Sequence, residues 1–529
     1  MDPGGPEYGD PALDGGDLVT AVQPGAPGTI ASLIGAISGA TLDGTGNAVT
    51  VNVPAAELEA AVHHLAASGG RLADLFGSGQ DPAVLHLVWA LDAERQYLIV
   101  QSDVAGDEYP PLSDIAPAAF AEECEIYEQF GIRPATGKPL NRVALPPHAG
   151  PDFPRLGHQP RPAPAEIHAP HTVGGHAFEF PFGPVRQVGM ESLYYGLVTS
   201  GEEIVDLYLF TWHKHRGLEW RLRGRTPREG LFHVERTEGL SAIALSWACA
   251  AAVEAALDVA PPPAAQRTRA VALEMERLYN HAAATAGLCQ ATGLTVGQSA
   301  AEIALERLLR LNAAVFGHRY LFGVMDAGGV RRAPDEAVLR AGLPGAHGEL
   351  RRAADALLST NSFLDRLEAA GIVTGEQARR LGLVGPVARA AGLTIDTRLD
   401  QPAQPYVEHP PAVAVRDSGD VLARFQVMQD EAAESVRLIG DLLDAGAGTG
   451  TATLPGAAGS GLGWAESSRG EALAWVALNA EGRITRARLR PASVRNWRGF
   501  DDACRSQNVF TDIPIIEASF WLTVAGTAR

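Results

Sequence analysis

Apolar residues in the first quarter of the chain follow first a helix-like and then a strand-like spacing. Helical periodicity over residues 56–68 is followed by two strand-like segments, AVLHLVWAL at 83–91 and QYLIVQS at 96–102, and then by helical spacing over 116–132. Because both kinds of element carry apolar positions, they can share one core. We therefore predict a small α+β domain over residues 18–146.

Three segments lack apolar periodicity. Residues 1–17 are acidic and rich in glycine and proline, which predicts a disordered tail. Residues 147–170 are dense in proline and poor in aliphatic side chains, so we predict a semi-rigid linker and a domain boundary there. The Gly/Ala/Thr-rich stretch 445–463 predicts a flexible surface insertion.

Helical spacing dominates the rest of the chain. Short strand-like segments at 176–184 and 202–212 come first. Helical patterns then cover 238–258, 264–288, 298–326, 335–370, 375–391 and 418–444. Alternating residues within 472–491 predict a terminal β element. The fold class that we expect is an α+β N-terminal domain followed by a mainly α-helical bundle over residues 171–529, with small β elements.

Composition and charge narrow the possible partners. The chain has 529 residues, too many for one ordinary core, and 46% of them are hydrophobic, as in globular proteins. Its net charge of −19 repels a phosphate backbone, so we expect no nucleic-acid partner. RLRGRTPR at 221–228 is nevertheless locally basic.

Cysteine usage and hydropathy indicate where the chain is located. Four cysteines lie far apart without a C-x-x-C pair, so a reducing, cytoplasmic setting fits better than a disulfide framework. The acidic N-terminus does not read as a signal peptide, and the most apolar helical segment, near 240–260, is too short and is interrupted by Glu254. We expect no transmembrane segment, and membrane contact only through partners.

Several segments, in a consistent order, resemble one known family. They include GPVRQVGMES (183–192), HRGLE (215–219), RTEGLSAIALSWACAAAVE (236–254) and SSRGEALAW (467–475). Together they resemble the large subunit of membrane-bound nickel–iron hydrogenases of the formate-hydrogenlyase type, and its relative, the quinone-side 49-kDa-like subunit of complex I. Residues 118–146 resemble the small peripheral-arm, 30-kDa-like subunit of complex I, so the resemblance implies that the two modules are fused.

The resemblance also locates the metal ligands of the family. Active hydrogenases hold their Ni-Fe centre with an early R-x-C-G-x-C and a late C-x-x-C. Here the early pair falls on Glu238 and Ser241, and the late pair falls on Thr523 and Gly526. Because nickel and iron need soft thiolates, we expect no metal ligands, no Ni-Fe centre and no hydrogenase activity of this chain's own.

The quinone ligands implied by the resemblance have changed as well. The complex I relative uses a histidine and a tyrosine to hydrogen-bond the quinone head, and the corresponding residues here are Arg186 and Gly239. Gly239 has no side chain, and an arginine does not readily release a proton. A quinone could therefore bind only with different partners.

Two polar residues stand at positions where the family performs chemistry. Glu191 matches a carboxylate that relays protons, and Arg469 matches an arginine that projects over the metal centre. We take both as catalytic candidates. The alternatives are that Glu191 is simply solvated, and that Arg469 braces the terminal β element by pairing with Asp396 or Glu471.

Five further residues are cofactor-side candidates. His215 and Arg216 match the pair that faces the nearest 4Fe-4S cluster of the small partner subunit, where positive charge raises the cluster's potential. The alternative is that Arg216 pairs with Glu219. A shared polar core, whose buried charges must be paired, is expected to contain Arg236, Asp396 and Arg398.

These features predict the large subunit of a membrane-associated redox complex that passes electrons from a partner's iron–sulfur clusters to a quinone or another acceptor. Its implied partners are a small iron–sulfur subunit and membrane-embedded ion-translocating subunits, and it would lie on the inner face of the cell membrane. The family name associates such complexes with NADH–quinone oxidoreductases and NAD binding. Two alternatives remain, a non-catalytic scaffold and a hydrogenase with unusual ligands. A scaffold should fill the emptied cavity with apolar side chains, whereas a working site should keep a water-accessible pocket near Glu191, Arg216, Glu238 and Arg469.

Overall fold

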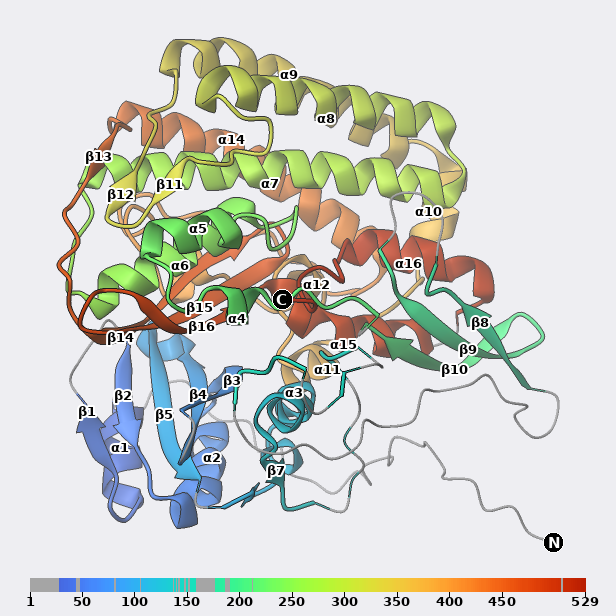
Figure 1. Ribbon diagram of the computed structural model, residues 1–529. Coiled ribbons are helices and arrows are strands. Elements are labelled where there is room, and N and C mark those ends of the chain that lie inside the picture. The colour runs from blue at the N-terminus through green and yellow to red at the C-terminus, as the bar shows by residue number, and fades with distance from the viewer. Residues whose placement is uncertain are drawn as a thin grey trace, which may run out of the picture.

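A computed structural model shows a chain of mixed helices and small sheets (Figure 1). It describes residues 28–529 except 44–47, 80–81, 105, 137, 139, 141–142, 147–148, 151–152, 158–176, 186–190, 212 and 506–507. The predicted tail over 1–17, most of the predicted linker over 147–170, and Arg186 lie outside the described residues. None of the helices in the described part has the length and apolar character needed to cross a bilayer.

A five-stranded sheet forms the N-terminal part, in the order β1-β2-β5-β4-β3, with only β2 and β5 parallel. Its strands are β1 (Thr41–Asp43), β2 (Val49–Asn52), β3 (Arg71–Gly79), β4 (Ala83–Leu91) and β5 (Gln96–Val104). The accompanying elements are α1 (Thr29–Ala36), α2 (Leu58–Ala67), β6 (Glu108–Tyr109), α3 (Phe120–Phe130) and β7 (Arg133–Pro134). The sequence predicts β4 and β5 but not β3, whose apolar pattern is interrupted by the buried Asp74.

Both faces of this sheet are buried, which explains why every residue of β4 except His86 is apolar. One face packs on the helices α1 and α2, through residues such as Leu87 and Leu98. The opposite face carries Phe76, Tyr97 and Ile99 and packs against the C-terminal sheet. The N-terminal sheet and the C-terminal sheet therefore share a hydrophobic core, which holds the N-terminal part against the rest of the chain in addition to the predicted linker.

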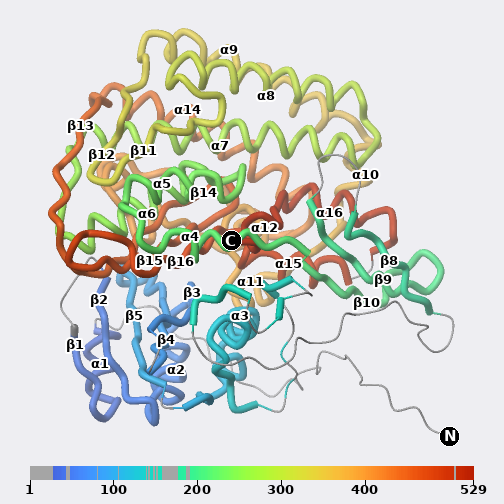
Figure 2. The backbone as a smooth tube through the Cα atoms, in the orientation of Figure 1, coloured from blue at the N-terminus to red at the C-terminus, as the bar shows by residue number. Residues whose placement is uncertain are grey.

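Five long helices form the second part of the molecule (Figure 2). They are α6 (Ala242–Ala256), α7 (Pro263–Thr292), α8 (Thr295–Phe316), α9 (Glu336–Leu358) and α14 (Val421–Asp444). α8 ends earlier than predicted because Gly317 adopts a left-handed conformation with φ 80°. The predicted helix over 335–370 is divided into α9 and α10 (Asn361–Leu367), and that over 375–391 into α11 (Gly375–Arg380) and α12 (Pro386–Ala390).

The C-terminal sheet has the order β14-β15-β16 and is antiparallel throughout. Its strands are β14 (Gly459–Ser467), β15 (Gly470–Leu478) and β16 (Ile484–Arg490). The predicted flexible insertion over 445–463 is thus wrong at its end, because β14 begins inside it and Leu462 is buried. Gly461 and Gly463 let β14 lie directly on α6, since a Cβ atom there would stand 2.3 and 2.0 Å from the backbone oxygens of Ala252 and Ala248.

We predict that Gly463→Ala lowers the free energy of unfolding by about 2 kcal/mol, because the added methyl group must displace the α6 backbone. Gly456→Ala is the matched control, since its nearest neighbour would lie 3.9 Å from the new Cβ atom. Chemical denaturation of both variants checks this. Equal stabilities would contradict the close packing of β14 on α6.

Smaller elements complete the chain. They are β8 (Phe178–Phe182), β9 (Tyr194–Ser200), β10 (Glu203–Phe210), α4 (Leu218–Arg221), α5 (Pro227–Val234), β11 (Met325–Asp326), β12 (Gly329–Val330), α13 (Thr397–Asp400), β13 (Gly450–Thr451), α15 (Ala492–Arg505) and α16 (Ile513–Phe520). The segment after α16 returns towards α4 and α5, where the Arg216 amide donates to the carbonyl of Ala528. This return brings the C-terminal segment beside the segment that precedes α4.

Candidate functional site

A buried carboxylate, Glu238, lies in the segment between α5 and α6 and accepts hydrogen bonds from three hydroxyl groups. Its Oε1 accepts a hydrogen bond from the hydroxyl of Ser241, and its Oε2 accepts bonds from the hydroxyls of Thr523 and Ser493, the latter at 3.2 Å. The backbone N–H of Gly526 donates to Thr523 Oγ1 at 3.1 Å. The four positions that the resemblance matches to cysteines therefore meet in one hydrogen-bonded cluster, which we call the Glu238 cluster.

Space in the Glu238 cluster is limited. A Cβ atom on Gly526 would stand 2.5 Å from Glu238 Oε2, so a side chain at position 526 would displace the carboxylate. Burial raises the pKa of Glu238, and the hydrogen bonds from Ser241 and Thr523 oppose that shift. Polar side chains thus occupy this position, which differs from the apolar filling expected of a scaffold. They are buried and closely packed, which also differs from the water-accessible pocket expected of a working site.

The donor set of the Glu238 cluster does not fit a Ni-Fe centre. It offers one carboxylate and hydroxyl oxygens, which are hard donors, where nickel and iron would require bridging thiolates. The four cysteines are buried elsewhere, with Cys249 in one core and Cys289 and Cys504 in another. Among the described residues, no three side chains of His, Cys, Asp or Glu are grouped so that they could hold a metal ion.

Glu191 and Arg216 hold the turn that carries Gly526. Glu191 accepts hydrogen bonds from the Ala525 amide at 2.8 Å and from Lys214 Nζ at 3.0 Å. Arg216 donates to the carbonyl of Ala525 at 2.7 Å and to that of Arg236 at 3.1 Å. The side chain of Glu191 is therefore only partly exposed to solvent. Its hydrogen-bond partner Ala525 directly precedes Gly526, a member of the Glu238 cluster.

The alternative pairing of Arg216 with Glu219 is not formed. Glu219 instead accepts from Arg486 at 2.7 Å and from Arg529 at 3.0 Å. Burial lowers the pKa of Arg216, and the nearby carboxylates of Glu191 and Glu238 oppose this shift. Its Nε is buried without a partner among the described residues. Arg216 thus remains a cation, and the carboxylates of Glu191 and Glu238 compensate its charge without forming an ion pair with it.

His215 stands beside the ring of Phe153, with 5.7 Å between ring centroids. Burial lowers the pKa of His215, so the imidazole is neutral at pH 7. The positive charge of the His215–Arg216 pair therefore resides on Arg216.

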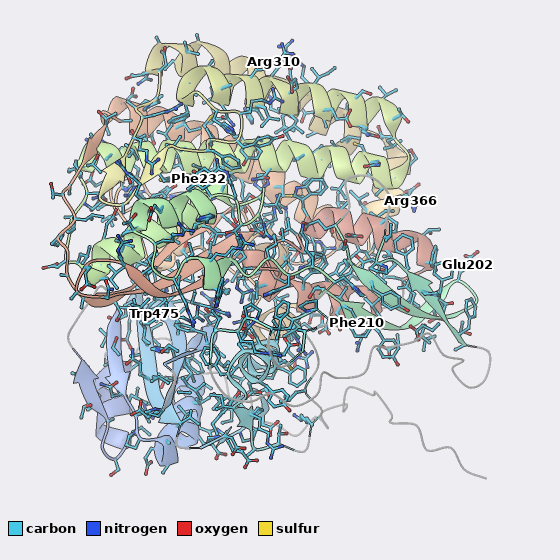
Figure 3. The ribbon with its side chains drawn as sticks, in the orientation of Figure 1. Glu202, Phe210, Phe232, Arg310, Arg366 and Trp475 are labelled. Carbon is cyan, nitrogen blue, oxygen red and sulfur yellow. The ribbon has the colours of Figure 1, made fainter. Side chains whose placement is uncertain are left out.

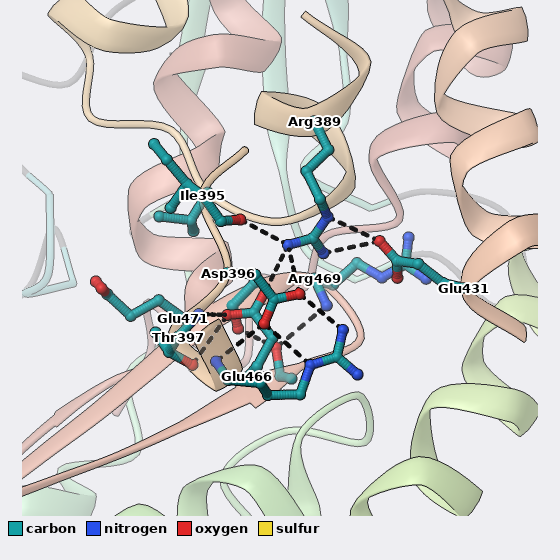
Figure 4. Close-up of polar contacts among 12 residues, drawn as sticks. Arg389, Ile395, Asp396, Thr397, Glu431, Glu466, Arg469 and Glu471 are labelled. Atoms are coloured by element: carbon teal, nitrogen blue, oxygen red, sulfur yellow. Dashed lines mark hydrogen bonds and ion pairs between the residues drawn. The ribbon is translucent and has the colours of Figure 1, made fainter. Parts of the chain in front are cut away.

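A fully buried ionic cluster lies between α7, α12, α14 and β14 (Figure 4). Arg389 is at its centre and reaches Glu431 at 2.8 Å, Glu466 at 2.9 Å and Asp396 at 3.3 Å. Arg398 joins Asp396 at 2.7 Å to Glu274 at 3.0 Å. We call this the Arg389 cluster.

The electrostatics of the Arg389 cluster keep Glu274 and Arg389 ionised, whereas burial and the neighbouring Asp396 raise the pKa of Glu466. Burial alone would raise the pKa of Glu274, but Arg398 and Arg277 outweigh it and bring the pKa to about 2. Burial would likewise lower the pKa of Arg389, but Glu431, Glu466 and Asp396 raise it. Opposite charges therefore compensate one another where water is absent.

The sequence predicts Arg236 in one polar core with Asp396 and Arg398, and the structure places it elsewhere. Its guanidinium pairs with Glu235 and lies over the rings of Phe232 and Phe322, at 3.9 and 4.6 Å from their centroids. The reason is the helix α5, whose last turn ends at the surface and carries Arg236 outward.

Arg469 also has partners other than those expected. It pairs with neither Asp396 nor Glu471, but donates to His281 Nδ1 at 2.9 Å, and His281 Nε2 lies 3.0 Å from Glu431. Burial lowers the pKa of Arg469 to about 9 and that of His281 to about 4. A neutral His281 with its proton on Nε2 satisfies both contacts, so Arg469 is linked to the Arg389 cluster through an imidazole.

Comparisons with known proteins identify relatives of this chain. Residues 301–453 match the family described as the 49-kDa subunit of respiratory-chain NADH dehydrogenase. Formate hydrogenlyase subunit 5 of Escherichia coli is 29% identical over 93% of this chain and 91% of its own length. Hydrogenase-4 component G of the same organism is 27% identical over 85% and 82%. The chain is therefore similar to subunits of hydrogenases and of complex I.

Structural similarity supports a shared fold. A chain of the membrane-bound sulfane sulfur reductase, an archaeal respiratory membrane complex, superimposes with a TM-score of 0.62 at 22% sequence identity, over 68% of this chain and 100% of that chain. The predicted resemblance is confirmed, while the 30-kDa-like assignment of residues 18–146 stays a prediction.

Glu276 is a site residue that the sequence analysis missed. It is fully buried on α7 and accepts hydrogen bonds from the Ile243 and Ala244 amides at the start of α6, at 2.7 and 3.1 Å. Glu274, Glu276 and Arg277 are close together in the sequence and all buried, because α7 is enclosed on every side. Charged residues close together on a helix that has no solvent-exposed face indicate buried polar contacts. This pattern could have identified Glu276 from the sequence.

We predict that Glu276→Gln reduces the pH dependence of stability. Burial raises the pKa of Glu276 from 4.5 to about 8. The folded protein therefore holds this proton more tightly than the unfolded chain, and stability falls as pH rises from about 5 to 8. Between these pH values the variant should gain roughly 1–3 kcal/mol relative to wild type.

Thermal and urea unfolding between pH 5 and 8.5 check this expectation. Glu302→Gln on the exposed surface of α8 is the control and should follow wild type. Parallel pH profiles for wild type and Glu276→Gln would contradict a raised pKa at this residue.

Proposed function

We propose that this chain is the large subunit of a membrane-associated redox complex that delivers electrons to a quinone or another small acceptor, and that no Ni-Fe centre takes part. The observation that carries the proposal is the Glu238 cluster. It places a carboxylate and hydroxyl groups where hydrogen-cleaving relatives of the family place thiolates. Such groups hold and transfer protons but do not bridge two soft metals.

The chain's own residues have defined tasks in this proposal. Arg216 supplies the positive charge that raises the potential of a 4Fe-4S cluster in a small partner subunit. Glu191, half-buried beside Lys214, exchanges protons between solvent and the Glu238 cluster. Reduction of a quinone consumes two electrons, which come from the partner's iron–sulfur clusters, and two protons, which come through these carboxylates.

The proposal also assigns neighbours and a location. The chain would contact a small iron–sulfur subunit and membrane-embedded ion-translocating subunits, and would lie at the inner face of the cell membrane through them. Support comes from the matching family, which is described as part of respiratory-chain NADH dehydrogenase, and from the relatives that are named as parts of formate hydrogenlyase and hydrogenase-4.

Two activities of the purified complex test the proposal together. Reduction of a soluble ubiquinone analogue by pre-reduced complex should proceed, and exchange between hydrogen gas and deuterated water should stay at the level of a blank. Hydrogen–deuterium exchange above the blank would favour a hydrogenase with unusual ligands. Absence of both activities would favour a scaffold, and either result would reject the proposal.

A further inference from the structure

Helices α4 and α5 display arginines and aromatic rings on the surface beside the Glu238 cluster. The exposed residues are Trp220, Arg221, Arg225, Phe232 and Arg236, which we call the α5 patch. Trp220 is 47% exposed and Phe232 is 54% exposed, although both are large and apolar. Figure 3 labels Phe232 on this helix. A surface of this composition is unusual for a group of side chains that serves only solubility.

The α5 patch is basic although the chain is acidic. Residues 221–236 contain five arginines and two glutamates, whereas the whole chain has a net charge of −19. Among the described residues, Arg221 and Arg225 form no ion pair. The pKa of His233 is lowered by partial burial and by Arg225, Arg221 and Arg236, so the positive potential of these side chains converges there. This surface therefore favours a negatively charged partner.

The aromatic part of the α5 patch is held in place before any partner binds. The Arg236 guanidinium is stacked over Phe232 and also donates to the Phe232 carbonyl at 2.7 Å. Glu235, which pairs with Arg236, accepts from the Gly323 amide at 2.8 Å and so joins α5 to the loop after α8. Thr226 and Glu229 cap the start of α5 reciprocally. Pre-ordered side chains lose little entropy on binding.

We propose that the α5 patch is the docking surface for a carboxylate-rich face of a partner protein. Exposed tryptophan, phenylalanine and arginine side chains together are the composition of protein–protein hot spots. A protein face offers apolar side chains for Trp220 and Phe232 as well as carboxylates for Arg221 and Arg225, whereas a phosphate backbone offers charge alone. This docking proposal depends on one part of the proposed function, namely that the chain is a subunit of a complex.

The location of the α5 patch gives the docking a consequence. Arg236 is followed by Thr237, Glu238 and the exposed Gly239. A partner seated on the α5 patch would therefore lie next to Gly239, which follows Glu238 in the sequence. Docking would restrict the access of water and of small molecules to the Glu238 cluster.

Charge reversal in the native complex tests the proposal. Tagged full-length chain carrying Arg221→Glu and Arg225→Glu is purified from its own host beside wild type and a control. The control is Arg351→Glu with Arg352→Glu on α9, where both residues are exposed. We expect the patch variant to lose one stoichiometric subunit, with at least about a tenfold weaker association, while the control retains it. Arg221→Gln with Arg225→Gln should have a smaller effect in the same direction.

A photo-crosslinking residue in place of Phe232 identifies what lies on the α5 patch. A crosslink to an acidic segment of the subunit lost in the variant supports the proposal. A full set of subunits in the patch variant, with an unchanged melting temperature, would overturn it. So would binding of the isolated chain to phosphatidylglycerol vesicles or to duplex DNA that charge reversal abolishes while the complex stays intact. Quinone and hydrogen-exchange assays on wild-type complex do not depend on these variants, so the two proposals can fail separately.

Discussion

Arg389→Ala should lower the free energy of unfolding by about 4 kcal/mol, the largest loss among the substitutions considered. The Arg389 side chain is fully buried and contacts three carboxylates, those of Asp396, Glu431 and Glu466. Its removal leaves these carboxylates without their shared cation, in a place that water does not reach. At least one of them must then take up a proton, so the loss should be smaller at pH 5 than at pH 8.

Urea denaturation of Arg389→Ala and wild type at both pH values measures this loss. Arg340→Ala is the matched control, since Arg340 pairs with Glu336 and Asp444 but lies at the surface, and it should cost less than about 1 kcal/mol. Similar losses for the two variants would show that the Arg389 cluster contributes no more than an exposed ion pair.

Glu238→Ala should cost about 3 kcal/mol and abolish quinone-analogue reduction by the complex. Three hydroxyl donors, those of Ser241, Ser493 and Thr523, lose their acceptor, and a cavity replaces the carboxylate. The turn that contains Gly526 then loses its attachment to the start of α6. Hydrogen exchange of backbone amides over residues 521–529 should accelerate, while the amides of α14 should be unaffected.

Ser241→Ala is the control for this prediction, because it removes one hydroxyl and leaves the carboxylate with two donors. It should cost about 1 kcal/mol and retain most of the activity. Wild-type activity in Glu238→Ala would contradict a role of the carboxylate in proton transfer. Unchanged exchange over 521–529 would contradict its structural role.

The fold could be predicted wherever one apolar pattern decides an element. β4 has the predicted bounds, and α7 and α14 begin within three residues of the prediction, because their apolar residues are frequent and regular. β14 could not be found in this way, since its glycines signal flexibility in the sequence and close packing in the structure. α15 was missed because aliphatic residues are few in it and Arg495 and Asn496 are buried, although Trp497, Phe500 and Cys504 recur at helical spacing.

The site could be predicted only as far as local sequence specifies it. The RTEGLS turn and the C-terminal segment allowed Glu238 and Thr523 to be predicted as site residues. The contact between them depends on the path of the chain after α16, which the local sequence does not specify. Pairings between distant charges were harder to foresee. Arg469 contacts His281 and Arg216 contacts backbone carbonyls, because burial selects partners by three-dimensional proximity and not by sequence spacing.

The central claim is that the Glu238 cluster replaces the thiolates required by a Ni-Fe centre. The most direct measurement is the amount of nickel and iron per chain, by mass spectrometry of the subunit released from its purified complex under non-denaturing conditions. The account predicts less than about one nickel per ten chains, and the same value for Glu238→Ala. Nickel and iron at one atom each or more per wild-type chain, lost in Glu238→Ala, would contradict it.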